Sequence, residues 1–454
     1  MLDAQRKVTA NKEILNKSWW ATFNRIPTSG AAKNWIDRLV EQTLEHEAKH
    51  HPRPRERKQK DLVSFKAAIG AFAADLLYHN RNEKSQGFMY RPFDRVELSF
   101  TLVSGTSFGK LITYWTELGW MERTGHIKST DDWEGHEIDG YSKARRYRGT
   151  QAFLDGAQSF QLTPTSVSND FEASHRHATL VQLRASKKNS FKTAKRGKTV
   201  RAKGPQFDAQ LATMRNLNQL MQNHAYSLTE PPMIRRMFNC VDREGFDFDL
   251  GGRFYGSSGD NWMEMSKEER KLITVDGQPT YEIDVSASHL SILYALSGKP
   301  IPSDYDLYGI SEYPREIVKQ VIVAAIGSGK LPTRWPVKFN EDYEKKHGRR
   351  PSSDYKLKEV VAAVVKRHPI LKTLKKDHLD WANLQYEESE CFLAAMLDLH
   401  ENHGIASLPI HDSLIVRQSD MFVAYDVLGQ AYQARLGFTP TITIPSEALD
   451  NQAA

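Results

Sequence analysis

Apolar side chains in the first half of the chain follow a helical period. They recur every three or four residues between 62 and 76 and again between 108 and 118, so both segments are predicted to be amphipathic helices. The second helix is expected to end at Gly119. Residues 120–123 and 144–150 then predict two short strands on either side of a polar loop.

This order of helix, helix, strand, polar loop (128–143) and strand occupies residues 61–156 and resembles a winged helix-turn-helix domain. In that family the second helix commonly enters the major groove of DNA, and the hairpin contacts backbone phosphates. The resemblance implies that cations on these elements bind nucleic acid. The candidates are Lys110, Arg145, Arg146 and Arg148. A winged fold that is used only for protein contacts is the alternative.

Two apolar, strand-like segments in the second half each carry one aspartate. Asp284 lies within residues 281–290, and Asp412 lies within residues 408–416. Two carboxylates that converge from separate strands can bind a pair of divalent cations, which stabilise the attacking and leaving oxygens of a phosphoryl transfer. If Asp284 were only a strand-end residue and Asp412 only a hairpin residue, the flanking apolar residues would have no explanation.

Cationic and amide side chains accompany the two aspartates along the sequence. Arg253 follows two glycines, whose backbone permits close approach to a ligand. Arg315 and Lys319 lie four residues apart and therefore share one face of a predicted helix, where two cations suit the oxygens of a triphosphate. Gln385 lies on a predicted helix at 379–403, which leads through a glycine into the second aspartate's strand.

The order of these motifs resembles the polymerase domain of family A DNA polymerases and of the related phage-type single-subunit RNA polymerases. That superfamily carries a Gly-Arg motif, an Asp-x-Ser strand, an Arg-x-x-x-Lys helix, a Gln-bearing helix and a His-Asp hairpin. All five occur in this order within residues 206–454. The resemblance implies a right-hand fold with a palm sheet, helical fingers and a helical thumb.

The same resemblance implies a role for each matching residue. The metal ligands would be Asp284, Asp412 and, through its carbonyl, Val285. The residues that bind the incoming triphosphate would be Arg315 and Lys319. The residues that contact primer or template would be Arg253, Gln385 and His411, the last at the primer terminus.

Two positions near the nucleotide depart from the family's pattern. Val323 stands four residues after Lys319, where relatives carry an aromatic residue beside the nascent base pair. His289 stands where DNA polymerases have glutamate and RNA polymerases often have glycine, so the sugar of the nucleotide is not predicted. Ser413 after His-Asp is similar to the RNA-polymerase branch, whereas the Ser-rich segment after Arg253 is similar to the DNA-polymerase branch.

The intervals between motifs are short, which implies reduced fingers and thumb. Within the fingers, residues 334–355 are rich in Lys, Arg and Pro and are expected to form a solvent-exposed loop or a basic strand guide.

The chain is basic, with 62 Lys and Arg against 56 Asp and Glu, a net charge of +6. Residues 186–204 include Lys195 and Arg196 and contain no acidic residue. Such a segment repels itself, so it is either a solvated linker or an arm that binds phosphates. The predicted domains are a helical segment with a basic linker, the winged-helix-like domain, the basic linker or arm, and the polymerase domain, at residues 1–60, 61–156, 157–205 and 206–454.

Composition also narrows the cellular setting. The chain has 454 residues and 40% hydrophobic content, which suffices for several domains with their own cores. Its apolar segments are too short to span a membrane, and the N-terminus has no apolar signal core, so a cytoplasmic protein without a membrane partner is expected. Two cysteines, Cys240 and Cys391, are too few for a disulfide framework or a thiolate zinc site.

Residues 46–50, His-Glu-Ala-Lys-His, match a pattern in which two histidines on one helical face bind zinc and the glutamate acts as a base. The flanking residues are charged, a proline follows at position 52, and no obvious third ligand lies nearby in the sequence. Because a catalytic zinc site takes three protein ligands, a zinc protease is not the favoured interpretation.

The sequence therefore predicts an α+β protein, in which a right-hand polymerase follows a winged-helix domain. The expected activity is template-directed nucleotidyl transfer, with a DNA polymerase favoured, in the replication of a phage, plasmid or mobile element and including one that primes its own synthesis. Two Mg²⁺ ions, or Mn²⁺ in their place, are the expected cofactors. The expected partners are template and primer DNA and nucleoside triphosphates, with RNA as the alternative nucleic acid.

Two other functions remain open. One is a single-subunit RNA polymerase or primase. The other is a DNA-binding replication or regulatory protein whose palm is catalytically silent, because Val323 replaces the family's aromatic residue. The sequence predicts neither the oligomeric state nor the template type.

Overall fold

Two compact units make up the chain in the computed structural model. The described residues are 7–8, 16–124, 144–174, 177–186, 188–190, 193–195, 197–201, 203–228, 230–257, 261–302, 306–374 and 379–446. The first unit comprises Met1–Asn218, Leu228–Arg235 and Gly256–Glu264. The second unit comprises Gln219–Ser227, Arg236–Tyr255 and Met265–Ala454. The division falls within α8 (Pro205–Met221) and β12 (Ile234–Phe238). Both units combine helices with mainly antiparallel strands, so the predicted α+β class is confirmed.

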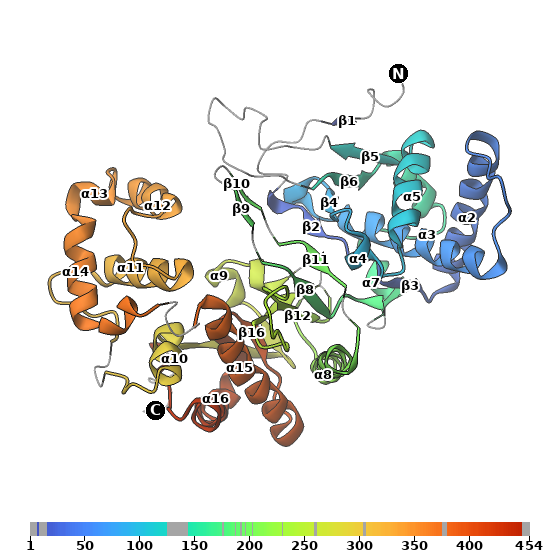
Figure 1. Cartoon of the computed structure of the whole chain (residues 1–454). Helices are drawn as coiled ribbons and strands as arrows, with labels where there is room; N and C mark the ends of the chain where they lie inside the picture. The colour runs from blue at the N-terminus through green and yellow to red at the C-terminus, as the bar shows by residue number, and fades with distance from the viewer. Residues whose placement is uncertain are drawn as a thin grey trace. The chain divides into compact units, whose positions relative to one another are not determined.

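Three helices enclose the core of the first unit (Figure 1). They are α2 (Gly30–His50), α3 (Gln59–His79) and α5 (Gly105–Glu117). Their inner faces share one apolar core, in which Trp35, Phe72 and Trp115 are fully buried. The rings of Phe72 and Trp115 have centroids 5.1 Å apart, so aromatic packing joins α3 to α5.

The elements predicted between residues 105 and 150 are present. Ser104 caps α5 by accepting a hydrogen bond from the backbone N–H of Ser107, and the helix ends before Gly119, which has a φ of +79°. Strands β5 (Met121–Thr124) and β6 (Arg146–Gly149) pair antiparallel. The predicted polar loop at 128–143 lies outside the described residues.

Short strands complete the first unit. One sheet has the order β1-β5-β6-β4-β2 and a second pairs β3 with β7. The strands not yet given are β1 (Lys7–Val8), β2 (Trp19–Trp20), β3 (Arg25–Pro27), β4 (Met89–Tyr90), β7 (Phe171–Ala173), β8 (Val181–Arg184), β9 (Lys188–Ser190), β10 (Thr193–Lys195) and β11 (Thr199–Val200). The short helices are α4 (Arg95–Leu98), α6 (Gln151–Gln158) and α7 (Val167–Asp170).

Among the described residues, α3 is the one helix long and apolar enough to cross a membrane, judged by length and composition alone. Of its most apolar 18-residue window, 72% is buried inside the protein. Its side chains, including Phe65, Ile69 and Leu76, belong to the core of the first unit. Its apolar character therefore has an explanation in core packing.

One antiparallel sheet organises the second unit. Its order is β14-β15-β17-β16, and β18 also pairs with β15. The strands are β14 (Thr274–Val275), β15 (Gln278–Val285), β16 (Leu408–Ile410), β17 (Ser413–Arg417) and β18 (Ile442–Thr443). Asp276 and Gly277 join β14 to β15 with φ values of +51° and +76°, the backbone that a two-residue hairpin of type I′ requires.

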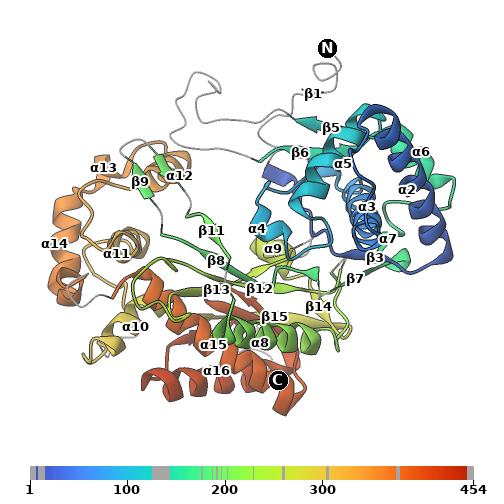
Figure 2. The same ribbon diagram turned by 45° about the vertical axis from the view of Figure 1, so that its right-hand side comes forward.

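Some helices of the second unit flank this sheet, and others form a separate group. They are α9 (Lys267–Arg270), α10 (Ser288–Leu296), α11 (Arg315–Ser328), α12 (Val337–His347), α13 (Pro351–Asp354), α14 (Leu357–Arg367), α15 (Trp381–His403) and α16 (Met421–Leu436). Figure 1 shows α11 to α14 gathered together. Helices α15 and α16 lie along one side of β15, and α16 contacts both β15 and β17 (Figure 2).

The prediction of a solvent-exposed loop or a basic strand guide at residues 334–355 is wrong, because this segment forms α12 and α13. Trp335, Phe339 and Tyr343 recur every four residues, and successive rings have centroids 5.5 and 5.7 Å apart. Charged residues dominate the composition of the segment, but this aromatic face supplies the apolar contacts that a helix needs. Gly348, with a φ of +71°, then ends α12.

Candidate active site

Strand β15 brings Asp284 beside the hairpin of β16 and β17. Asp284 lies opposite Ser413 in the antiparallel register, and the N–H of Val285 donates a hydrogen bond to the carbonyl of Asp412 at 2.9 Å. Ile283 and Val285 are buried. Because successive side chains of a strand point to opposite faces, their burial leaves Asp284 on the other face, where it is half-buried.

Asp412 lies in the two-residue turn of this hairpin. Ile410 pairs with Ser413 across the turn, and His411 has a φ of +49°. A positive φ costs a non-glycine residue roughly 1–2 kcal/mol, so the surrounding hairpin must stabilise it. The hydroxyl of Ser413 contributes by donating a hydrogen bond to the carbonyl of Ile410 at 3.0 Å. Turn residues escape the alternation of a strand, which lets Asp412 approach Asp284 although the two are not paired in register.

The two aspartates carry uncompensated negative charge. Burial raises the pKa of Asp284 to about 6, and the charge of Asp412 adds to the shift. Burial also raises the pKa of Asp412, with a further contribution from the charge of Glu388. Within the described part of the chain, no residue forms an ion pair with either aspartate. Such a pair favours binding a proton or a metal ion.

Neighbouring carboxylates are compensated instead. Glu282 lies two residues before Asp284 on the same strand, and its two oxygens accept hydrogen bonds from Arg270 at 2.9 and 3.0 Å. The hydroxyl of Ser413 also lies 3.1 Å from Glu282, and its one proton is shared between Glu282 and the carbonyl of Ile410. The missing counter-charge at Asp284 and Asp412 is therefore a local property of those two residues.

Arg253 and His289 meet on one buried glutamate. Glu388 is 1% exposed, and its Oε2 lies 2.7 Å from Arg253 and 3.4 Å from Nε2 of His289. Burial alone would raise the pKa of Glu388, but His289 and Arg253 lower it to about 2. Arg253 comes from β13 (Gly251–Gly256), His289 from the first turn of α10 and Glu388 from α15, so this cluster fixes three elements around the hairpin.

His411 lies close to this cluster, and Gln385 lies on the same helix as Glu388. Gln385 precedes Glu388 by one turn of α15 and is half-buried. Burial lowers the pKa of His411, and the charge of Arg253 lowers it further, whereas Asp412 and Glu388 act in the opposite direction. Arg253 and His411 thus lie near Asp412, whereas Gln385 is placed only on the helix that carries Glu388.

Helix α11 presents its predicted cations on one exposed face. Arg315 and Lys319 are exposed, as is Val323 one turn further on, whereas Val318 and Ile322 are buried. The charge of Lys319 acts to lower the pKa of Asp284, although burial and the charge of Asp412 outweigh it. Arg315 forms an ion pair with Asp306 at 2.8 Å.

Tyr308 lies close to both cations of α11. The guanidinium of Arg315 and the ammonium of Lys319 lie 5.1 and 5.9 Å from the centroid of its ring. Burial raises the pKa of Tyr308 to about 12, and Asp412 and Asp284 also raise it, while Arg315 lowers it. The residue is 6% exposed, so both cations lie beside a buried aromatic ring.

The sequence prediction missed Tyr308 and Glu388. Tyr308 lies on no periodic segment, and Glu388 stands among other acidic residues on α15, so neither carries a signal that separates it from its neighbours. The spacing of Glu388 from Gln385, one helical turn, is the only hint that the two share a face.

The cations predicted to bind nucleic acid in the first unit have varied surroundings. Lys110 lies 2.9 Å from Glu47, and Arg148 lies 2.8 Å from Glu122. Arg146 is buried, with its guanidinium 4.5 Å from the ring centroid of Tyr90. Arg145 is exposed. The backbone of Lys195 belongs to β10, and Arg196 lies outside the described residues. Their role in binding stays a prediction.

Comparisons with known proteins identify no family. No protein-family model matches the chain, and no curated protein matches it. Among solved structures, the chain is similar to the POL domain of Pol1 from M. smegmatis in complex with DNA primer-template and dNTP, at 12% sequence identity and a TM-score of 0.31. The match covers 57% of this chain and 57% of that chain. This TM-score is too low to establish a shared fold, so the residues of the site must carry any functional conclusion.

Proposed function

We propose that this chain is a template-directed nucleic-acid polymerase, with DNA synthesis as its favoured activity and two-metal phosphoryl transfer as its chemistry. The observation that carries the proposal is the half-buried pair Asp284 and Asp412, which lacks an ion-pair partner among the described residues, while the charge of Lys319 on α11 acts on Asp284. A purely structural carboxylate would be compensated, as Glu282 and Glu388 are. Excess negative charge beside two exposed cations suits a metal-bound triphosphate.

The donor atoms of the site fit magnesium. Asp284, Asp412 and the carbonyl of Val285 offer oxygen ligands only, which Mg²⁺ prefers, and Mn²⁺ accepts the same set. Two such ions, when bound, would supply activation of a primer 3′-hydroxyl and neutralisation of the leaving pyrophosphate. Because metal binding requires ionised carboxylates, affinity for Mg²⁺ is expected to fall as the pH drops below the Asp284 pKa of about 6.

The exposed face of α11 would bind the incoming nucleotide. Lys319 and Arg315 would contact the triphosphate oxygens, and Arg315 would exchange Asp306 for phosphate as it does so. The ring of Tyr308 lies beside both cations. Val323, further along the same face, would lie beside the nascent base pair, and His289 would contact the sugar.

The cluster around Glu388 would hold the primer and template. Glu388 fixes the guanidinium of Arg253 from one side, which leaves its remaining donors for a phosphate or a base edge. Gln385 on the same helix would contact the template, and His411 in the hairpin turn would position the primer terminus. Each assignment comes from the family resemblance, and those of Arg253 and His411 are also supported by their closeness to Asp412.

We also propose that the first unit has a winged-helix function, in which α5 and the β5–β6 hairpin recruit DNA. A polymerase domain joined to a DNA-recruiting domain suits a replication protein of a phage, plasmid or mobile element, including one that primes its own synthesis.

Two observations favour the alternative functions. Ser413 after His-Asp favours an RNA polymerase or primase, and Val323, which is 48% exposed and not aromatic, favours a DNA-binding protein with a silent palm. The sugar and primer preferences of the purified chain separate these possibilities.

The decisive experiment measures Mg²⁺-dependent incorporation of dNTPs and NTPs, in separate reactions, on primed and unprimed templates. We expect dNTP incorporation on the primed template. Incorporation restricted to NTPs would establish the RNA polymerase or primase, and no incorporation under any condition would establish the silent palm.

Asp284→Asn and Asp412→Asn test the site itself. Each should lower incorporation by at least about 1,000-fold, because metal ions contribute several kcal/mol to such reactions, while DNA binding is retained. Asp276→Asn, a carboxylate of the same sheet that is bound by Arg417, is the matched control and should keep its activity. Normal primer extension by both site variants would disprove the proposal.

A further inference from the structure

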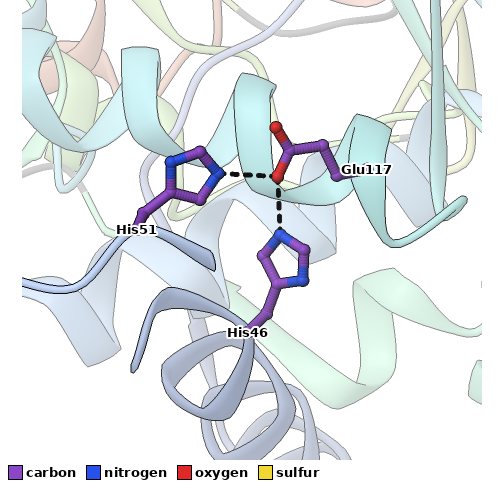
Figure 3. Close-up of side chains that lie close together, drawn as sticks. All are labelled: His46, His51 and Glu117. Carbon is purple, nitrogen blue, oxygen red and sulfur yellow. Dashed lines mark hydrogen bonds and ion pairs between the residues drawn. The ribbon is translucent and has the colours of Figure 1, made fainter. Parts of the chain in front are cut away.

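Two histidines and one glutamate of the first unit converge outside the candidate active site. Nε2 of His46 and Nε2 of His51 each lie 2.7 Å from the same oxygen, Oε2, of Glu117 (Figure 3). One ligand atom from each of the three residues lies within 4.8 Å of the other two. Within the described ranges, this trio is the one group of three or more His, Cys, Asp or Glu side chains with that spacing.

Rigid elements hold the three side chains. His46 lies in the last turns of α2, His51 is the residue that caps its C-terminus, and Glu117 is the last residue of α5. The backbone N–H of His51 donates to the carbonyl of Glu47 at 2.9 Å, which fixes the chain as it leaves the helix. The imidazole of His51 also stacks on Tyr114, with ring centroids 4.9 Å apart.

A buried hydrogen bond joins the two helices one turn away from the trio. Nε1 of Trp115 donates to the hydroxyl of Thr43 at 3.1 Å, and both residues are buried. Since Thr43 and His46 share a face of α2, and Trp115 precedes Glu117 by two residues, this bond sets the spacing between the helices next to the cluster. The three ligand atoms are thus placed by packing and not by the flexibility of long side chains.

Glu47 cannot serve as a catalytic base beside these histidines. It is 3% exposed, and its carboxylate is bound by Arg57, by Lys110 at 2.9 Å and by the hydroxyl of Tyr114 at 2.9 Å. Burial raises its pKa, but these three partners outweigh burial and hold the pKa below its usual value. The chemistry of a zinc protease therefore lacks its base, and the glutamate of the His-Glu-Ala-Lys-His motif is structural.

We propose that His46, His51 and Glu117 form a binding site for a divalent transition-metal ion such as Zn²⁺, which clamps the end of α2 to the end of α5. Two imidazole nitrogens and one carboxylate oxygen are a donor set that zinc accepts and that magnesium does not favour. The ligands differ from those the motif predicts, because His51 takes the place of His50 and the third ligand comes from another helix.

The geometry needs only a small adjustment to accept the ion. Donor atoms around a tetrahedral Zn²⁺ lie roughly 3.3 Å apart, given bonds of about 2.0–2.1 Å, so each histidine would withdraw from Glu117 by about 0.6 Å from its present 2.7 Å. The side chains of His51 and Glu117 are each 35% exposed, and that of His46 is 10% exposed, so an ion can enter from solvent. That exposure also leaves room for a water molecule as the fourth ligand.

Titration of the metal-free full-length chain with Co²⁺ tests the proposal, because tetrahedral Co²⁺ with nitrogen and oxygen ligands absorbs visible light. We expect one Co²⁺ per chain with the visible spectrum of a tetrahedral ion, displaced by Zn²⁺, and a rise in the unfolding temperature when Zn²⁺ is added. Co²⁺ bound by oxygen ligands at the carboxylate pair of the second unit absorbs only weakly and is not counted by this spectrum. His46→Ala, His51→Ala and Glu117→Gln should each weaken binding by at least about 100-fold and remove the temperature rise.

His50→Ala is the matched control. His50 lies on the same helix, with its ring centroid 4.7 Å from that of His46, but it is not one of the three ligands. It should retain the Co²⁺ spectrum and the stoichiometry. The proposal is overturned if the intact chain gives no such spectrum, or if the three ligand variants bind Co²⁺ as the intact chain does. In either case the three side chains only join α2 to α5 through hydrogen bonds.

Discussion

The carboxylates at the two candidate metal sites differ in their ion-pair partners, and their pKa values are shifted in opposite directions. Glu117 of the first unit accepts hydrogen bonds from two histidines, and although burial raises its pKa, His51 and His46 together hold it below the usual value. Asp284 of the second unit has no ion-pair partner among the described residues, and burial and Asp412 raise its pKa to about 6. One site has nitrogen and oxygen donors already in contact, and the other has oxygen donors held in a repulsive arrangement.

This difference indicates how each region would use a metal ion. A cluster that is stable without an ion gains a structural clamp from Zn²⁺, with three protein ligands and a water molecule as the fourth. A repulsive carboxylate pair lowers the stability of the metal-free fold and is relieved only when a cation binds, which is typical of catalytic centres. The following predictions test this contrast, from the largest expected effect to the smallest.

Metal choice should separate the second unit's site from the first unit's cluster. We expect Mg²⁺ or Mn²⁺ to support incorporation and Zn²⁺ alone to support at least about 100-fold less, because the site offers oxygen donors only. The measurement is the initial rate of primer extension by metal-free protein supplied with each ion in turn. Equal rates with Zn²⁺ and Mg²⁺ would contradict the contrast in donor chemistry.

Removal of the charge of Glu388 should be costly. Glu388→Gln leaves Arg253 without its buried counter-charge, so we expect the free energy of unfolding to fall by roughly 2–4 kcal/mol. Urea denaturation at neutral pH measures the loss. Glu387→Gln, which removes a partly exposed partner of Arg435, is the control and should cost less than about 1 kcal/mol. Equal losses would show that Glu388 is not the centre of the cluster.

Loss of the ammonium of Lys319 should weaken nucleotide binding. Lys319→Ala is expected to raise the KM for the nucleotide by about 10- to 100-fold, because a cation that contacts phosphate contributes roughly 1.5–3 kcal/mol. Steady-state incorporation kinetics give the value. Lys338→Ala, on the exposed surface of α12, should leave KM unchanged, so an equal effect of both variants would indicate general electrostatic attraction.

Asp284 should make the metal-free protein less stable as the pH rises, which is the opposite of the usual effect of an aspartate. Its pKa is raised on folding, so its stabilising contribution is complete below pH 4 and is lost as the pH rises through about 6. In EDTA at pH 8, Asp284→Asn should therefore raise the free energy of unfolding by roughly 1–2 kcal/mol after allowance for solvent screening, and this gain should vanish near pH 4.

Asp276→Asn should change the stability at pH 8 in the opposite direction. Burial raises the pKa of Asp276, but the N–H of Ala225 and the side chain of His224 outweigh burial and lower it. Its stabilising contribution is present above the usual aspartate pKa and is lost as the pH falls, so this variant should be less stable than the intact chain at pH 8. If both variants change stability in the same direction, the raised pKa of Asp284 is wrong.

Local patterns in the sequence predicted much of the architecture. The four-residue spacing of Arg315, Lys319 and Val323 places them on one exposed face of α11, as the structure shows. The capping serine and terminal glycine of α5 mark its limits, and the paired strands after it were expected. Residues 334–355 were misjudged because their charged residues obscured an aromatic face.

Contacts between distant segments could not be predicted in this way. The sequence shows that Asp284 and Asp412 occupy similar strand-like segments, but the pairing of β15 with β17 brings them together. Glu388, Tyr308 and Glu117 were missed because each acts through side chains from other elements. The motif at residues 46–50 identified His46 as a metal ligand candidate, whereas His51 and Glu117 became candidates only through the packing of α2 against α5.

The sequence by itself therefore determined which residue types lie on which helical face or strand, because backbone periodicity relates neighbours a few residues apart. The tertiary structure decided which carboxylates are compensated and which are not. Electrostatic energy depends on the distance between charges and on their exposure to water, and both depend on how remote segments pack. For this reason Glu282 and Asp284, two residues apart on one strand, differ so much: Arg270 neutralises the first, whereas no ion pair among the described residues neutralises the second.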